Sequence, residues 1–192
     1  MSFVLSLRSL PVTVALFHIR AQRHARRSRD EFSLASSIRP GELNALLGLA
    51  RGRRKVVELG TGTAWSAISL ALDEASRHVI TYDPSVRTQR EAYLARAWPS
   101  VRGRIEFREE PDSNGPRAGE AVELLFVDSS HDRESVVRAF GAWRDALLPG
   151  AVVAFHDYEH PRYPGVREAI AELGLVGSTV GGLFVWRVPD GS

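Results

Sequence analysis

Hydrophobic residues along most of the chain follow two alternating rhythms. From residue 54 onward, short apolar runs rich in β-branched residues alternate with longer segments in which apolar side chains recur at helical spacing. The short runs predict seven strands, at residues 56–60, 78–82, 104–108, 122–127, 151–155, 175–180 and 183–188. The longer segments predict helices at residues 64–75, 86–98, 132–147 and 166–173. This alternation indicates an α/β fold, with a parallel sheet that helices cover on both faces.

Glycine, proline and serine mark the expected turns between these elements. Gly181-Gly182 predicts a hairpin between the last two strands. The expected architecture is therefore a Rossmann-like, doubly wound, mostly parallel seven-stranded sheet with an antiparallel hairpin at one edge. Ser85 is suited to cap the helix 86–98, which Pro99 should end, and Pro149-Gly150 predicts a turn before the fifth strand.

The first forty residues have a different pattern. Residues 3–19 are mostly apolar, and five arginines follow them within ten residues. The uncharged run at residues 9–19 is too short to cross a bilayer, which takes about 20 residues, and the basic residues lie on the wrong side for a signal peptide. We expect residues 1–40 to form a basic helical arm and residues 41–192 to form the main domain. The arm could pack on the body, cover the site as a lid, form an interface, or contact an anionic membrane or RNA.

Composition places the chain among globular proteins, with 44% hydrophobic and 25% charged residues in 192. The absence of cysteine excludes disulfides, thiolate metal sites and a cysteine nucleophile, and it fits the reducing cytoplasm, where we expect the protein. The net charge of +2 conceals an asymmetry. Residues 1–55 hold ten arginines and Lys55 against three acids, a net +8, whereas residues 56–192 carry a net −6.

Acidic residues gather where the predicted strands end. Ligands of parallel sheets bind beyond the carboxyl ends of the strands, so these residues are the first candidates for a site. The acidic residues at or directly after four apolar strands are Glu58, Asp83, Asp128 and Asp157. A folded domain has little structural need for this arrangement, and a binding site explains it.

The loop after the first strand has the features of a nucleoside site. Gly60 and Gly62 allow a ligand to approach the backbone, and Asp83, 23 residues after Gly60, can accept hydrogen bonds from both hydroxyls of a ribose. Glu58 precedes the loop, and an anionic side chain there favours a ligand with an amino group over a pyrophosphate. Trp65 follows the loop and could pack either on the cofactor or in the core.

Three segments resemble the class I S-adenosylmethionine (SAM)-dependent methyltransferases. VVELGTGTAWSAISLA looks like their motif I, and VITYDPS looks like their ribose-binding motif II. VELLFVDSSHDRESVVRAFGAWRDALLPGAVVAFHDY is similar to the fourth and fifth strand region of small O-methyltransferases, including the catechol-type and the sugar or macrolide enzymes. The resemblance covers residues 40–188. Ala64 stands where motif I usually has its third glycine, and residues 109–113 leave the adenine contact open.

The resemblance implies where the cofactor and the acceptor bind. SAM should lie over the ends of the first two strands, with the acceptor near the fourth and fifth. The residues expected to bind the cofactor are Glu58, Gly60, Thr61, Gly62, Trp65, Asp83 and Asp128.

A hydroxyl acceptor becomes a good nucleophile only when it loses its proton, and two devices can achieve this. One is a general base; the resemblance assigns this role to His131, with Asp128 as its catalytic neighbour. The other is a divalent cation, for which Asp128, His156 and Asp157 are the candidate ligands. The family commonly uses Mg²⁺, whereas an imidazole ligand favours Mn²⁺ or another transition metal. The alternatives are a local capping role for His131 and a buried structural role for His156.

These expectations define an O-methyltransferase that moves the methyl group of SAM to a hydroxyl of a small molecule, such as a natural product, a sugar or a phenol. We expect a homodimer, no membrane span and no nucleic-acid partner. The alternatives are an RNA or protein methyltransferase that uses the basic arm, a non-catalytic SAM-binding protein, and a nucleotide-dependent oxidoreductase.

Overall fold

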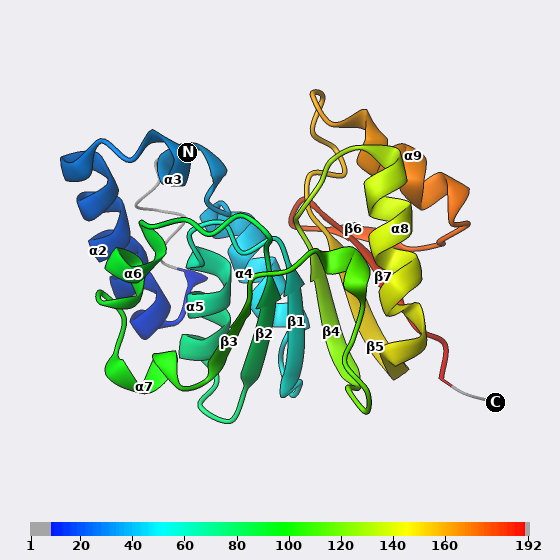
Figure 1. Cartoon of the computed structure of the whole chain (residues 1–192), viewed down its shortest axis with the longest axis horizontal. Helices are drawn as coiled ribbons and strands as arrows, with labels where there is room; N and C mark the ends of the chain where they lie inside the picture. Colours follow the sequence, from blue (N-terminus) through cyan, green and yellow to red (C-terminus); the bar gives the residue numbers. More distant parts are fainter. Residues whose placement is uncertain (1–8, 191–192) are drawn as a thin grey trace.

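The computed structural model describes residues 9–190, whose core is a seven-stranded sheet (Figure 1). Its strands follow the order β3-β2-β1-β4-β5-β7-β6. The strands are β1 (Lys55–Leu59), β2 (His78–Tyr82), β3 (Ile105–Arg108), β4 (Val122–Val127), β5 (Leu147–Phe155), β6 (Ser178–Val180) and β7 (Leu183–Arg187). The pairs from β3 to β5 are parallel, whereas β7 runs antiparallel to both β5 and β6. The expected doubly wound sheet and its edge hairpin are confirmed.

Helices cover both faces of this sheet. They are α2 (Val12–Ser28), α3 (Glu31–Ser36), α4 (Pro40–Leu49), α5 (Trp65–Asp73), α6 (Arg90–Leu94), α7 (Pro99–Arg102), α8 (Arg133–Trp143) and α9 (Pro164–Glu172), with 3₁₀ turns η2 (Asp112–Asn114) and η3 (Arg144–Ala146). Successive strand residues point to opposite faces. In β4, Leu124 and Phe126 pack in the core beneath α2, α4 and α5, whereas Leu125 and Val127 pack beneath α8 and α9. A strand buried on both faces explains the continuous apolar run that predicted it.

The helix expected at residues 86–98 is the largest departure from the sequence pattern. The structure has only α6 there, and Gln89 rather than Ser85 precedes its first turn. The backbone N–H of Ser85 donates instead to the Asp83 carboxylate at 2.7 Å, which holds Ser85 in a turn. Pro99 begins α7 rather than ending the preceding helix, because proline is well suited to the first helical position.

A second departure concerns the start of β5. The expected helix 132–147 ends as α8 at Trp143, and η3 leads directly into β5. The strand begins at Leu147, which pairs with Val122, and continues through Pro149 and Gly150 across a register shift. The expected turn at Pro149-Gly150 is therefore an irregularity within an extended strand.

The expected arm contains α2 and α3, which pack on the body, while residues 1–8 lie outside the described part of the chain. Phe17 and His18 of α2 contact the Trp65 ring of α5 edge-on. Nε2 of His18 lies 3.0 Å from the Ser69 hydroxyl, and burial lowers the pKa of His18 to about 4. Of the helices described, none is long and apolar enough to cross a membrane. The domain boundary at residue 40 stays a prediction.

Candidate active site

A cavity of about 770 Å³ opens at the carboxyl ends of β1, β2, β4 and β5. Its volume is within the range of small-molecule and cofactor sites. Loops that follow these parallel strands form most of its wall, and α3 and the residues before α4 close one side. The predicted site residues that line it are Gly60, Thr61, Gly62, Trp65, Asp83, Asp128, His131, His156 and Asp157. The parallel sheet thus gathers residues spread over about a hundred positions of sequence.

The glycine loop needs its glycines for two different reasons. Gly60 has a φ of 102°, and a Cβ at this position would lie 2.2 Å from the carbonyl oxygen of Asp128. Gly62 has a φ of 50°, and its N–H donates to Oδ2 of Asp83 at 2.9 Å. Ala64 adopts a φ of 68° where the motif usually has glycine, so the left-handed turn is kept with a small side chain. The loop is thus hydrogen-bonded to Asp83 and packs directly on the Asp128 backbone.

Glu58 lies beneath this loop rather than in the cavity wall. Its carboxylate is fully buried and accepts a hydrogen bond from the Thr81 hydroxyl at 2.6 Å, and Thr81 also contacts Thr61 at 2.7 Å. Burial raises the pKa of Glu58 to about 8, although hydrogen bonds from Ser66 and Thr81 oppose this rise. The structure therefore links Glu58 to the cavity through Thr61. Its expected contact with a cofactor amino group stays a prediction.

Trp65 joins the cavity to the arm. Its ring is buried and meets the rings of Phe17, His18 and Tyr93 edge-on, at centroid distances between 5.2 and 6.3 Å. Most of the ring therefore belongs to the core, while the residue still contributes to the cavity wall. Of the two roles weighed from the sequence, the core role accounts for its aromatic contacts.

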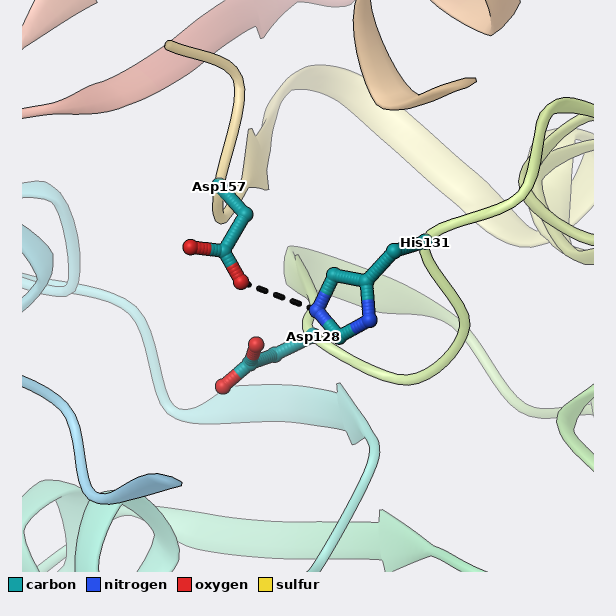
Figure 2. A group of neighbouring side chains, drawn as sticks. All are labelled: Asp128, His131 and Asp157. Atoms are coloured by element: carbon teal, nitrogen blue, oxygen red, sulfur yellow. Dashed lines mark ion pairs between the residues drawn. The ribbon is translucent and has the colours of Figure 1, made fainter. Parts of the chain in front are cut away.

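His131 and Asp157 meet above the ends of β4 and β5 (Figure 2). Nε2 of His131 lies 2.8 Å from Oδ2 of Asp157. The Tyr163 ring stacks on the imidazole at 4.0 Å, and the His160 ring stacks on Tyr163 at 4.5 Å, so the plane of His131 is fixed from one side. Asp157 has a φ of 57°, a left-handed conformation that aspartate tolerates better than most residues. Strain of this kind is common where a backbone holds a functional side chain.

His156 is surrounded by carboxylates. Nδ1 lies 3.0 Å from both Asp128 and Asp157, and Nε2 lies 3.3 Å from Oε2 of Glu42. Burial alone would lower the pKa of His156, but these three acids outweigh it and raise the pKa to about 12. The half-buried His156 ring therefore favours its protonated form, whose single positive charge is shared among three carboxylates.

The surroundings of His156 shift the pKa values of Asp128 and Asp157 in opposite directions. Burial raises the pKa of Asp128 even though His156 opposes the rise. Burial would also raise the pKa of Asp157, but His131 and His156 together hold it well below its usual range. Asp157 therefore carries the firmer negative charge of the pair.

A group of ligand atoms suited to a cation lies at the same place. Asp128, His131 and Asp157 each offer one atom, and these atoms lie within 4.8 Å of one another (Figure 2). This group differs in one member from the expected set of Asp128, His156 and Asp157. A protonated imidazole has no free lone pair for a metal, whereas Nε2 of His131 is buried and has no well-directed hydrogen bond among the described residues.

Two residues of this site, Glu42 and Gly165, gave no clear signal in the sequence, and a third, Asp112, lies in the range 109–113 that was left open for the adenine contact. Glu42, on α4, bonds the far nitrogen of His156 across 114 positions of sequence. Gly165, on α9, packs so closely on the His131 backbone that a Cβ would lie 2.5 Å from the His131 carbonyl oxygen. Asp112 lines the cavity and accepts a hydrogen bond from the Ser129 hydroxyl at 2.5 Å. Of residues 109–113, only those from Pro111 to Ser113 reach the cavity.

The fold and this cavity define an α/β protein with a nucleoside-type site at the carboxyl edge of its sheet. The family described as "Methyltransferase domain" matches residues 57–158, which is more than half of the chain. The chain belongs to this methyltransferase family. No curated protein matches its sequence significantly.

Solved structures share the fold at low sequence identity. The O-methyltransferase TomG from Streptomyces achromogenes, involved in tomaymycin synthesis and solved in complex with SAM, is 23% identical, with 87% of this chain and 86% of that chain covered and a TM-score of 0.62. A putative caffeoyl-CoA O-methyltransferase from Staphylococcus aureus is 14% identical, covering 90% and 97%, with a TM-score of 0.65. CalS11, a TDP-rhamnose 3'-O-methyltransferase of calicheamicin biosynthesis, is 18% identical, covering 78% of each chain, with a TM-score of 0.60.

Proposed function

We propose that this protein is a SAM-dependent O-methyltransferase that acts on a hydroxyl group of a small molecule. The observation that carries the proposal is the position of His131, held by Asp157, in the cavity that also contains the glycine loop and Asp83. A proton acceptor and a nucleoside-type site thus lie in one cavity of small-molecule size. Membership of the methyltransferase family supports the reaction, and the SAM complex of TomG and the sugar substrate of CalS11 support the cofactor and the class of acceptor.

The β1–β2 half of the cavity suits the adenosine and amino-acid parts of SAM. Asp83 receives N–H groups from Gly62 and Ser85, one on each oxygen, and its remaining lone pairs can accept the ribose hydroxyls. Gly60 and Gly62 leave the backbone open to close approach, and the first turn of α5 provides free amides. Thr61, Trp65 and Asp128 complete the proposed cofactor site, with Glu58 acting from below through Thr61.

His131 is the proposed general base. Its Nε2 is buried against Asp157, whereas Nδ1 forms no hydrogen bond with any described residue and the side chain remains 31% exposed. Nδ1 is therefore the atom that takes the proton of the acceptor hydroxyl as the oxygen forms its new bond to carbon. The Asp157 carboxylate stabilises the positive ring that results, as in other aspartate–histidine pairs. When bound, SAM supplies the electrophilic methyl group, and the protein's task is alignment.

A divalent cation is a second device that the proposed site could use to activate the acceptor. Asp128, His131 and Asp157 fit one, because two carboxylates and one imidazole nitrogen converge there, and the mixed set suits Mn²⁺ better than Mg²⁺. Such an ion would polarise the acceptor oxygen. It would also draw electron density from the ring of His131 and weaken Nδ1 as a base. We therefore propose that proton transfer to His131 is the principal route.

Calorimetry tests this proposal directly. S-Adenosylhomocysteine, the demethylated product, should bind with a micromolar Kd, which corresponds to about −8 kcal/mol. Incubation with SAM and a panel of phenols, sugars and sugar nucleotides should then transfer a methyl group, and His131→Ala should abolish the transfer without changing the affinity for the product. No binding of the product, or binding of NAD⁺ instead, would overturn the proposal. Binding without any transfer would favour a non-catalytic SAM-binding protein. The expected homodimer stays a prediction.

A further inference from the structure

Arginines gather on the wall of the cavity around its acidic floor. The arginines that line it are Arg39, Arg87, Arg138 and Arg162. They come from four separate segments: the residue before α4, the loop after β2, the exposed face of α8 and the loop between β5 and α9. Because the fold brings them together from distant parts of the chain, their location in one cavity is a property of the tertiary structure.

Three of these arginines lie beyond ion-pair distance of every acidic side chain described. Glu42 and Asp132 attract Arg39 and Arg138 only at longer range. Within the described part of the chain, Arg39, Arg138 and Arg162 form no ion pair, and Arg138 only donates to the Ser135 hydroxyl at 3.1 Å. Arginines elsewhere, such as Arg108 and Arg117, are paired with glutamates. Arg87 differs from the three, because its guanidinium stacks 3.9 Å above the Phe32 ring at the cofactor side of the cavity.

The acids that share the cavity are already engaged. Asp83 accepts two backbone N–H groups, and Asp112 accepts the Ser129 hydroxyl. Asp128, Asp157 and Glu42 all face His156. None of these described carboxylates forms an ion pair with Arg39, Arg138 or Arg162, so the guanidinium groups of the three arginines remain free to bind a ligand.

The cofactor is a poor explanation for these charges. SAM has a sulfonium and an ammonium group against one carboxylate, so it is a net cation, and three guanidinium groups would repel it. Arg138 and Arg162 also lie on segments that follow β4 and β5, the strands whose ends hold Asp128 and Asp157. Arg39 is three residues before Glu42, which contacts His156. The three arginines thus surround the acceptor half of the cavity.

We propose that the acceptor is an anion, and that Arg39, Arg138 and Arg162 bind a phosphate or carboxylate group of it while its hydroxyl lies at His131. This inference rests on the proposed function and names the class of its substrate. Arginine suits such a group because its planar guanidinium donates two parallel hydrogen bonds to phosphate or carboxylate oxygens. The anionic group must lie toward the rim, since the floor holds Asp128 and Asp157. An acceptor with separate anionic and hydroxyl ends satisfies both requirements.

The test uses calorimetry on the full chain saturated with S-adenosylhomocysteine and without added metal. Inorganic pyrophosphate probes for a phosphate group and citrate for carboxylates. At least one should bind the wild type, and the triple variant Arg39→Gln/Arg138→Gln/Arg162→Gln should bind it at least tenfold more weakly. The matched control is Arg51→Gln/Arg54→Gln/Arg144→Gln, which removes three exposed arginines outside the cavity and should bind like the wild type.

The other possible results overturn the inference, and they show whether the proposed function fails with it. If S-adenosylhomocysteine does not bind the wild type, the proposed function fails and the inference fails with it. If it binds but neither anion does, or if both triple variants lose anion affinity equally, only the inference fails. Loss of S-adenosylhomocysteine affinity in the cavity variant would assign the arginines to the cofactor carboxylate. Binding of a short RNA with no binding of either small anion would also overturn it.

Discussion

Nε2 of His131 lies 2.8 Å from Oδ2 of Asp157, although the two residues follow different strands. His131 enters the site from the loop after β4, and Asp157 lies directly after β5. The pair exists because β4 and β5 are parallel neighbours whose carboxyl ends coincide, with Val127 paired to Phe155. It joins a proton acceptor to a carboxylate that stays ionised.

Replacing Asp157 by asparagine tests this pair. Asp157→Asn keeps the shape of the side chain but removes the charge that stabilises the protonated His131 ring. We expect kcat to fall by about 10²- to 10⁴-fold, the contribution of a general base, while the Kd for S-adenosylhomocysteine changes less than twofold. Steady-state kinetics with an acceptor found by screening, together with calorimetry, measures both. An unchanged kcat would remove His131 and Asp157 from the catalytic mechanism.

Gly165 is a positioning residue whose effect should be kinetic. A Cβ there would lie 2.5 Å from the His131 carbonyl oxygen and 2.6 Å from the Arg133 nitrogen, so Gly165→Ala must displace the loop that holds His131. We expect kcat to fall about tenfold or more, since small misplacements of reacting groups are costly, with unchanged binding of S-adenosylhomocysteine. The control is Gly141→Ala on α8, where a Cβ meets nothing within 4 Å. That variant should keep kcat and gain about 0.5–1 kcal/mol of stability. Equal kinetics in the two variants would contradict the positioning role.

Asp83 should matter for the cofactor and not for proton transfer. Asp83→Ala removes the acceptor for the N–H of Gly62 and for the proposed ribose hydroxyls. Losing hydrogen bonds to a charged group costs about 1.5–3 kcal/mol each, so the Kd for S-adenosylhomocysteine should rise at least tenfold. Glu109→Gln, which changes an exposed carboxylate outside the cavity, is the control and should bind normally. Equal affinities would move the ribose away from Asp83.

Removal of metal separates the two routes of activation. If His131 acts as a base through Nδ1, treatment with a chelator should leave the rate within about twofold, because no step depends on an ion. An excess of Zn²⁺ should then inhibit by binding Nε2 of His131 together with Asp128 and Asp157. Loss of activity on chelation and recovery with Mn²⁺ would instead assign the activation of the acceptor to a metal.

The buried His18 predicts a specific loss of stability in acid. Because burial lowers its folded-state pKa to about 4 from 6.5, the unfolded chain takes up the proton first as the pH falls. The contribution of the neutral ring is complete above pH 6.5 and is lost between pH 6.5 and 4, about 3 kcal/mol in full. In His18→Gln, the free energy of unfolding should fall less between pH 7.5 and 5 than in the wild type. Parallel urea titrations of both proteins at these pH values measure the two free energies. An equal fall of the free energy of unfolding in the variant and the wild type would contradict the prediction.

The sequence by itself determined the layered fold and the place of the glycine loop and Asp83, the proposed cofactor side of the site. Buried strands such as β4 and β5 are visible as apolar runs, and the glycine loop and Asp83 are separated by one strand–helix unit of fixed length. Local patterns were less reliable around residues 86–98, because the Asp83 carboxylate holds Ser85 in a turn and Pro99 begins a separate helix.

Only the tertiary structure decided the contacts on the proposed acceptor side. Glu42, His156 and Asp128 meet from three distant segments, and their charges set one another's protonation. The ring of His131 is fixed by Asp157 and Tyr163, and its backbone by Gly165, none of which is a sequence neighbour. The sequence supplies these side chains, but distances of about 3 Å between them arise only when the parallel strands align their ends. A group's charge inside a protein depends on those distances and on burial, which no local pattern contains.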